Sequence, residues 1–211
     1  NANPGSKHWK AALEVEKYLK GTADYGVVYG RQQDGIPYVP LCAYSDASWA
    51  DDPDDRTSRA GIMLWSWGGP IEWRSNRQKS QALSSCEAEY MAASTCTQSV
   101  VWGTRLFREF GYEDLGIRDG ENVATEQEME GHRPVVIYED NSGCIEWSKN
   151  PVDHQRAKHI DLRYHYVRAK VRSGEVKLVH CPTDEMMADL LTKYLSAPRF
   201  AYLRDKMLAV E

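Results

Sequence analysis

The feature that most constrains the fold of this 211-residue chain is a short apolar run, PVVIYED, at residues 134–140. A near-continuous apolar run of this length is typical of a strand that is covered on both faces in a parallel sheet. Such a strand needs a parallel partner and helices around it. The run ends at Asp140, directly before helix-like residues, and this is where open α/β sheets build their sites.

The other segments predict a mixed α/β architecture around that strand. Three antiparallel strands are expected at residues 41–47, 60–67 and 70–74, and a long helix from Ser84 to about Phe110. A leading helix is expected at residues 8–20 and a further strand at 175–180. Shorter helices are expected at residues 141–150, 159–173, 184–193 and 198–210. The order predicts a mixed five-stranded sheet, with three antiparallel strands plus parallel strands, flanked by helices.

Composition excludes several classes of protein. The five cysteines are odd in number and form no C-x-x-C pair, so neither a disulfide framework nor a thiolate zinc site is indicated. No window approaches ~18 consecutive apolar residues, and the polar start lacks a secretory signal pattern. We therefore expect a soluble, intracellular protein without a membrane contact and without a small-molecule cofactor.

The net charge of −5 is unevenly distributed. Eight acids and one arginine between Glu109 and Glu130 contribute −7, which leaves +2 on the remaining residues. The stretch 111–132 has little apolar periodicity, and we interpret it as an acidic insertion or flexible loop. The overall charge therefore does not exclude a nucleic-acid partner.

Two aspartates stand at the ends of predicted strands. Asp46 interrupts the apolar run of 41–47, and Asp140 ends the buried-type strand. Each also has a structural explanation: Asp46 can be an exposed strand-end residue, and Asp140 can cap the following helix. Neither residue indicates a function by itself.

The two glutamates of the long helix can be separated by their positions. The spacing of Ser84 and Glu87 fits a capping box, in which Glu87 reaches back to the Ser84 amide. Glu89 instead shares a helix face with Ala93 and Cys96, a stripe of small residues that should face the sheet. A carboxylate on such a face is costly unless a metal or hydrogen bonds compensate it. We assign Glu87 to capping and Glu89 to chemistry.

A fourth acid, Asp189, lies between apolar Ala188 and Leu190, where no capping role explains it. Four dispersed carboxylates without cysteine or histidine ligands suit Mg²⁺ or Mn²⁺ acting on phosphate. His180, at the end of the strand 175–180, could shuttle a proton, although a satisfied or exposed histidine is the simpler interpretation.

Basic and amide side chains beside these acids suit contacts with phosphate and with a minor groove, although a solvated charged face also explains them. The residues predicted to bind nucleic acid are Ser48, Arg74, Asn76, Arg77, Gln78, Lys79, Asn141, Lys158 and Arg163.

Five ordered blocks then become recognisable. They are YSDASWADDPDDRTSRAGI (44–62), ALSSCEAEYMAAS (82–94), IYEDNSGCIEWSKNP (137–151), KHIDLRYHYVR (158–168) and ADLLTK (188–193). Together they closely resemble the ribonuclease H domain of copia-type (Pseudoviridae-like) LTR retrotransposon polyproteins. The resemblance implies a ribonuclease H-like fold for residues 36–211. Residues 1–35 look like the tail of the preceding reverse-transcriptase or connection region.

The resemblance also implies a function. Asp46, Glu89, Asp140 and Asp189 would hold two Mg²⁺ ions, for which Mn²⁺ can substitute, and these would hydrolyse the RNA strand of an RNA–DNA hybrid. The implied partners are the hybrid and the reverse-transcriptase domain of the same polyprotein. The implied location is a cytoplasmic virus-like particle that can gain access to the nucleus. Two alternatives stay open: an inert or domesticated nucleic-acid-binding module, and a DNA nuclease or strand transferase on the same fold.

Overall fold

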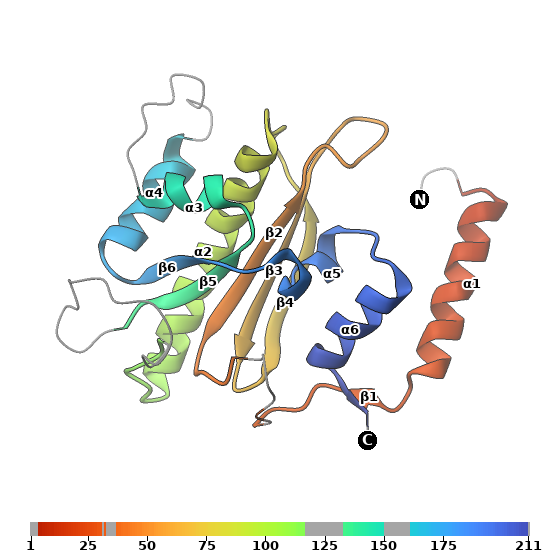
Figure 1. Ribbon diagram of the computed structural model, residues 1–211, viewed down its shortest axis with the longest axis horizontal. Coiled ribbons are helices and arrows are strands. Elements are labelled where there is room, and N and C mark those ends of the chain that lie inside the picture. The colour runs from red at the N-terminus through yellow and green to blue at the C-terminus, as the bar shows by residue number, and fades with distance from the viewer. Residues whose placement is uncertain (1–3, 31, 33–36, 117–132, 150–160, 211) are drawn as a thin grey trace.

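The computed structural model describes residues 4–30, 32, 37–116, 133–149 and 161–210. The predicted acidic insertion lies mostly outside the described residues, as does Lys158. Figure 1 shows a central sheet with helices packed on both sides and one helix standing apart.

The sheet has five strands in the order β4-β3-β2-β5-β6. The strands are β2 (Cys42–Ser48), β3 (Arg59–Ser66), β4 (Gly69–Arg77), β5 (Val135–Glu139) and β6 (Val176–His180). β2, β3 and β4 are antiparallel, whereas β5 runs parallel to both β2 and β6. The predicted mixed sheet, and the parallel partner expected for the 134–140 run, are both confirmed.

Alternate residues from 41 to 44, at the start of β2, belong to two separate cores, as expected for a strand buried on both sides. Leu41 and Ala43 belong to the core beneath α2 (Ser85–Glu109), α3 (Ser142–Lys149) and α4 (Asp161–Arg172). Cys42 and Tyr44 belong to the core on the opposite face, which is covered by α5 (Asp189–Thr192) and α6 (Ala197–Met207). The sheet is therefore the middle layer of three.

One predicted helix differs from the structure. Residues 184–193 form a short 3₁₀ turn, Thr183–Glu185, followed by α5, instead of one continuous helix. The physical reason is that four consecutive residues, 186–189, are buried. A helix against a core buries one face only, so a continuous helix would expose some of them. The break places Asp189 in the first turn of α5.

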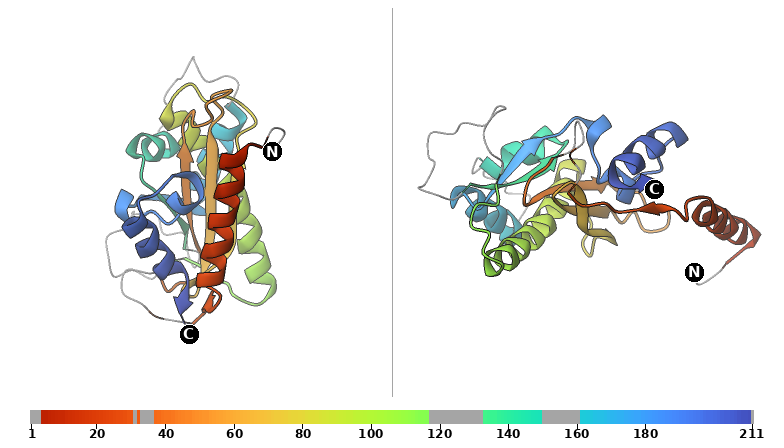
Figure 2. Two further views of the ribbon diagram at one scale, coloured as in Figure 1. Left: turned by 90° about the vertical axis from the view of Figure 1, so that its right-hand side faces the viewer. Right: turned by 90° about the horizontal axis from the view of Figure 1, so that it is seen from below.

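A second, two-stranded sheet joins the segment after the leading helix to the C-terminal residues. β1 (Tyr25–Gly26) pairs antiparallel with β7 (Ala209–Val210), which follows the end of α6. The leading helix α1 (Ser6–Gly21) has no buried residue and projects from the body, as Figure 2 shows. Its Tyr18 ring meets the edge of Phe200 on α6. The division of the chain near residue 35 remains a prediction.

No helix among the described residues is long and apolar enough to cross a membrane.

Candidate active site

Asp46 lies inside β2, where its side chain is fully buried. Opposite it on β3 stands Gly61, and a Cβ added there would lie 2.7 Å from Thr192 Cγ2 and 3.0 Å from the Ala188 carbonyl oxygen. Glycine therefore lets α5 pack directly on β3 beside Asp46. This close packing brings the α5 side chains to the aspartate.

Helix α2 presents Glu89 to the same place. The side chain is 6% exposed, and Ala93 and Cys96 on the same face are fully buried, which confirms the predicted core-facing stripe. Ser84 caps the helix by accepting a hydrogen bond from the Glu87 amide at 3.2 Å. Glu87 accepts from the Leu83 amide at 2.9 Å, one residue before the predicted Ser84 amide. The two glutamates thus have the different placements that the spacing indicated.

Asp140 follows the last residue of β5, and Asp46 lies on the parallel neighbouring strand. One carboxylate oxygen from each of Asp46, Glu89 and Asp140 lies within 4.8 Å of the others. Three predicted residues, distant in the sequence, are therefore brought together at one end of the sheet. The Thr183 hydroxyl also donates to Asp140 Oδ2 at 3.1 Å.

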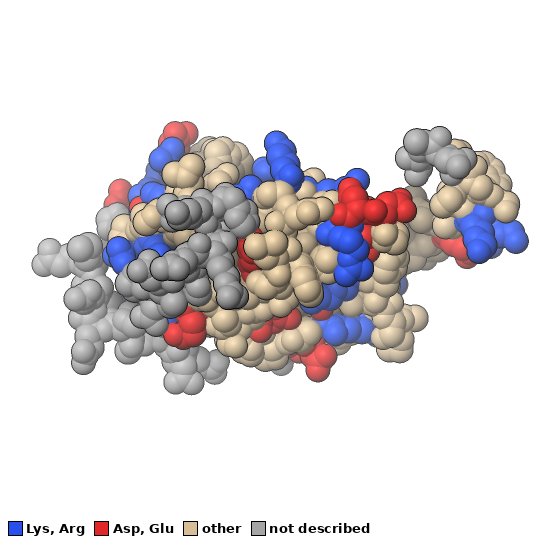
Figure 3. All heavy atoms as spheres, turned by 90° about the horizontal axis from the view of Figure 1, so that it is seen from above, with Lys and Arg blue, Asp and Glu red and all other residues tan. Residues whose placement is uncertain are grey.

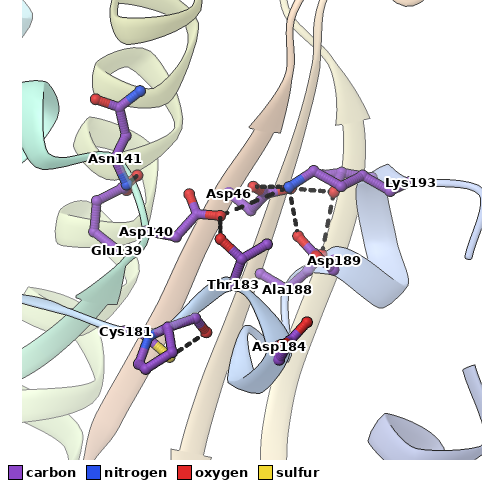
Figure 4. A network of polar contacts seen from close by, with 12 residues as sticks. Asp46, Glu139, Asp140, Asn141, Cys181, Thr183, Asp184, Ala188, Asp189 and Lys193 are labelled. Carbon is purple, nitrogen blue, oxygen red and sulfur yellow. Dashed lines mark hydrogen bonds and ion pairs between the residues drawn. The ribbon is translucent and has the colours of Figure 1, made fainter. Parts of the chain in front are cut away.

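The fourth predicted acid, Asp189, joins this group through a lysine. Lys193 Nζ lies 2.7 Å from Asp189 Oδ1, 2.9 Å from Asp46 Oδ1 and 3.9 Å from Asp140 Oδ2. Figure 4 shows the lysine reaching between the aspartates. Arg199, from α6, pairs with the other oxygen of Asp189 and donates to the Thr183 carbonyl oxygen. Asp189 is fully buried between these two cations.

Sequence reasoning missed four residues of this centre: Thr192, Lys193, Arg199 and Glu139. The Thr192 hydroxyl donates to Asp46 Oδ2. Glu139 is fully buried next to Asp140 and accepts from the Asn141 amide at 3.3 Å. The one available signal was a glutamate inside an otherwise apolar strand, since a buried carboxylate needs compensation.

Burial changes the proton affinity of the acids. It raises the pKa of Glu89 to about 11, with smaller contributions from the nearby carboxylates of Glu139, Asp46 and Asp140. It raises the pKa of Asp189 to about 6, although Lys193 and Arg199 oppose the shift. For Lys193, burial lowers the pKa, but the charges of Asp46 and Asp189 outweigh burial and raise it.

His180 is exposed at the end of β6 and lines a cavity of about 680 Å³, together with Tyr138, Pro182 and Tyr202. Tyr44, which also lines this cavity, stacks on Tyr138 with ring centroids 4.9 Å apart. The proton-shuttle role predicted for His180 remains a prediction.

The predicted nucleic-acid-binding residues differ in their exposure and in their ion pairs. Arg77 pairs with Asp52 and Asp55, and Arg74 pairs with Glu72. In the view of Figure 3, Lys and Arg form several separate groups, most of them beside Asp or Glu. Arg74, Asn76, Arg77 and Lys79 are exposed, and Ser48 and Arg163 are half-buried.

Two of the predicted binding residues use their side-chain amides within the protein. The buried Gln78 donates to the Ala88 carbonyl oxygen at 2.8 Å, which ties the end of β4 to the start of α2. Asn141 Oδ1 accepts from the Cys144 amide at 3.0 Å and so caps α3. These contacts position the acidic centre, and a role in binding nucleic acid remains a prediction for both.

The donor set fits a hard divalent cation. Clustered carboxylate oxygens are the ligands that Mg²⁺ and Mn²⁺ prefer. Among the described residues, Glu89 Oε2 is buried without a hydrogen-bond partner, so one oxygen of the cluster is available to a ligand.

The strand order β4-β3-β2-β5-β6, with one acid inside β2 and another directly after β5, defines a ribonuclease H-like α/β protein. Comparison with known sequences then gives its relatives. The chain is 37% identical over 204 residues to the retrovirus-related Pol polyprotein from transposon RE2 of Arabidopsis thaliana. It is 34% identical over 203 residues to that from transposon TNT 1-94 of Nicotiana tabacum. The chain is thus related, along nearly its whole length, to one segment of the retrovirus-related Pol polyproteins of copia-type transposons.

These matches cover 97% and 96% of the chain but only 13% and 14% of the two polyproteins. Comparison with protein-family models gives no match. A similar solved structure is the crystal structure of LC11-RNase H1 in complex with an RNA/DNA hybrid. It has a TM-score of 0.47 and 13% sequence identity, and the match covers 72% of this chain and 93% of that chain.

Proposed function

We propose that the chain is a metal-dependent endonuclease that hydrolyses the RNA strand of RNA–DNA hybrids during reverse transcription of a transposon. The observation that carries this proposal is the convergence of Asp46, Glu89 and Asp140 within 4.8 Å, with Asp189 held beside Asp46 by Lys193. The relationship to a segment of Pol polyproteins supports it, because reverse transcription creates such hybrids.

The acids have separate roles in this proposal. Asp46, Glu89, Asp140 and Asp189 would hold two Mg²⁺ ions, which Mn²⁺ could replace, and Asp46 would be the ligand common to both. When bound, the ions activate a water molecule and stabilise the leaving 3′ oxygen. The protein contributes position: packing on β3 fixes α5, and capping by Ser84 fixes the first turn of α2. The expected products carry 5′-phosphate and 3′-hydroxyl ends.

The substrate would be recognised mainly through its backbone. Exposed Arg74, Asn76, Arg77 and Lys79 lie on or just after β4, the edge strand that pairs with β3. We propose that these residues hold phosphates of the DNA strand, while 2′-hydroxyl groups of the RNA are read across the wide minor groove.

The natural setting belongs to the same proposal. Residues 1–35 would be the tail of a reverse-transcriptase region, and residues 36–211 the ribonuclease H domain. The reverse-transcriptase domain of the same polyprotein would be its partner, inside a particle in the cell.

A strand-specific cleavage assay tests the proposal. An RNA–DNA hybrid, the matching DNA duplex and the matching RNA duplex are each labelled on one strand and incubated with Mg²⁺ or with a chelator. We expect cleavage of the RNA strand of the hybrid only, and only with Mg²⁺. Cutting of the DNA duplex would favour a DNA nuclease or strand transferase. Binding of the hybrid without cutting would favour an inert binding module.

A further inference from the structure

The cation Lys193 occupies a central place in the acidic centre. Its Nζ bonds to Asp46 Oδ1 at 2.9 Å and to Asp189 Oδ1 at 2.7 Å, and lies 3.9 Å from Asp140 Oδ2. Both bonded aspartates are fully buried, whereas the lysine side chain is 34% exposed. One ammonium group thus neutralises charge on carboxylates from β2, from α5 and from the end of β5.

Lys193 is attached so that it can leave this place. It directly follows α5, in extended backbone, and the next residue, Tyr194, is fully exposed. Its stem has four flexible carbons and carries a strongly hydrated charge. The ammonium group therefore has a route from the carboxylates to solvent that does not disturb the buried residues of α5.

Arg199 provides the contrast within the same centre. It pairs with Asp189 through the opposite oxygen and also donates to the Thr183 carbonyl oxygen. The planar guanidinium group is fixed by contacts on two elements, and it contacts neither Asp46 nor Asp140 in any interaction found among the described residues. Arg199 is thus suited to anchor Asp189 alone, whereas Lys193 links Asp189 to Asp46.

We infer that Lys193 is a resident counter-ion of the acidic centre that competes with divalent cations for Asp46 and Asp189 and moves to solvent when a cation binds. The inference rests on the proposed metal centre and adds a residue that sets its cation affinity. The physical reason is that two positive charges cannot share the same carboxylate oxygens at close range without strong repulsion. Lys193 is a positioning residue: in its place it also holds the two aspartates together.

Cation binding without nucleic acid tests the inference. Mn²⁺ affinity is measured by calorimetry for the wild type, Lys193→Met and Lys170→Met. Lys170 is the matched control, because its Nζ bonds both oxygens of Glu175, at 2.7 and 2.9 Å, in a pair that excludes the acidic centre. A charge at this distance shifts a carboxylate equilibrium by one to three decades, so we expect Lys193→Met to bind Mn²⁺ roughly tenfold or more tightly. Lys170→Met should bind as the wild type does.

Thermal stability is a second measurement on the same variants. Without Mn²⁺, Lys193→Met should have a lower melting temperature than the wild type, because Asp46 and Asp189 then repel each other. Addition of Mn²⁺ should raise the melting temperature of Lys193→Met by more than that of the wild type. Any decrease in the melting temperature of Lys170→Met should be the same with and without Mn²⁺. Equal or weaker Mn²⁺ affinity in Lys193→Met would overturn the inference alone. No Mn²⁺ binding by any of the proteins would overturn the metal centre, and with it the inference.

A measurement on the wild type avoids the variants altogether. Acetylation of lysines by a small reagent is followed by mass spectrometry with and without Mn²⁺. Displacement of the ammonium group should increase the labelling of Lys193 several-fold and leave Lys170 unchanged. Unchanged or decreased labelling of Lys193 at saturating Mn²⁺ would contradict its movement to solvent.

Discussion

The two sides of the acidic centre differ in how the protein compensates their charge. On the α5–α6 side, Asp46 and Asp189 are fully buried but bonded to Lys193, Thr192 and Arg199. On the α2–β5 side, Glu89 has a buried oxygen without a partner among the described residues. The pKa of Asp189 accordingly rises only to about 6, whereas that of Glu89 rises to about 11.

This difference separates two requirements of a site built from carboxylates. The α5–α6 side is held together by the protein's own cations, so it keeps its shape without a ligand. On the α2–β5 side, Lys193 reaches Asp140 only at 3.9 Å, and Glu89 has no ion pair among the described residues, so the charged state of Glu89 depends on a cation from solution. Substitutions on the two sides should therefore affect activity alike but stability differently.

The largest effect should come from Asp140→Asn and Asp189→Asn, one substitution on each side. Both should reduce cleavage of a hybrid by roughly 10³-fold or more, because several kcal/mol of transition-state stabilisation are lost at ~1.4 kcal/mol per decade. Their stabilities should diverge. Asp189→Asn puts an amide nitrogen, which cannot accept a hydrogen bond, in place of an oxygen that accepts from Lys193 or Arg199, and should cost about 1–3 kcal/mol.

Asp140→Asn, by contrast, removes a repulsive charge and should keep or raise the stability of the metal-free protein. Single-turnover cleavage and chemical denaturation measure the two properties. Equal stability changes in both variants would show that the two sides do not differ as described.

The pair Glu89→Gln and Glu87→Gln compares two glutamates of one helix. Glu89→Gln should lose most of the activity, because a neutral amide holds a divalent cation poorly. Glu87→Gln should retain most of it, since glutamine can also accept the hydrogen bond from Leu83. Initial rates at saturating hybrid measure the difference. An inactive Glu87→Gln beside an active Glu89→Gln would reverse the assignment.

The stability of the metal-free protein should depend on pH in an unusual direction. The folded pKa values of Glu89 and Asp189 are raised from 4.5 and 3.8 to about 11 and about 6. The folded state therefore binds more protons than the unfolded state between these values. Its stability is fully present below about pH 4 and is lost as pH rises, by on the order of 1 kcal/mol per pH unit.

Thermal melts in chelator from pH 5 to pH 8 measure this slope. Glu89→Gln should flatten it, because the titrating carboxyl is gone, and Mn²⁺ should reduce it in the wild type. A wild-type melting temperature that rises over this range would contradict the uncompensated state of Glu89.

The smallest effect should follow Gly61→Ala, which tests how α5 is placed. The new Cβ would lie 2.7 Å from Thr192 Cγ2 and 3.0 Å from the Leu191 Cβ, so α5 must shift. Such overpacking costs about 1–3 kcal/mol. Gly103→Ala is the control, because there the nearest contact is the end of the Leu41 side chain at 3.3 Å. Gly61→Ala should lower both the stability measured by chemical denaturation and the cleavage rate, whereas Gly103→Ala should change neither.

The α2–β5 side could be predicted from the sequence because it depends on local patterns. Asp140 follows a buried-type strand, and Glu89 lies one helical turn before Ala93, so both positions follow from the periods of a strand and a helix. The capping assignment of Glu87 was right in kind and displaced by one residue, since helix ends are the least constrained part of such patterns.

The α5–α6 side could not be predicted in the same way. Its arrangement depends on the break between Glu185 and Asp189, which the burial of Met186 and Met187 in the tertiary core imposes. In a continuous helix the Asp189 side chain would point in a different direction from the one it has in the first turn of α5. Arg199 reaches the centre from a separate helix, and no local spacing encodes that contact.

The central claim is that these acids form a metal-dependent centre for hydrolysis of RNA in hybrids. The most direct test is the rate of RNA-strand cleavage by the wild type and by Asp46→Asn over a range of Mg²⁺ concentrations, with equal hybrid binding and equal circular dichroism as controls. The wild-type rate should rise with Mg²⁺ to a plateau, and Asp46→Asn should stay roughly 10³-fold lower at every concentration. Comparable rates for the two proteins, or wild-type cleavage that persists in chelator, would contradict the claim.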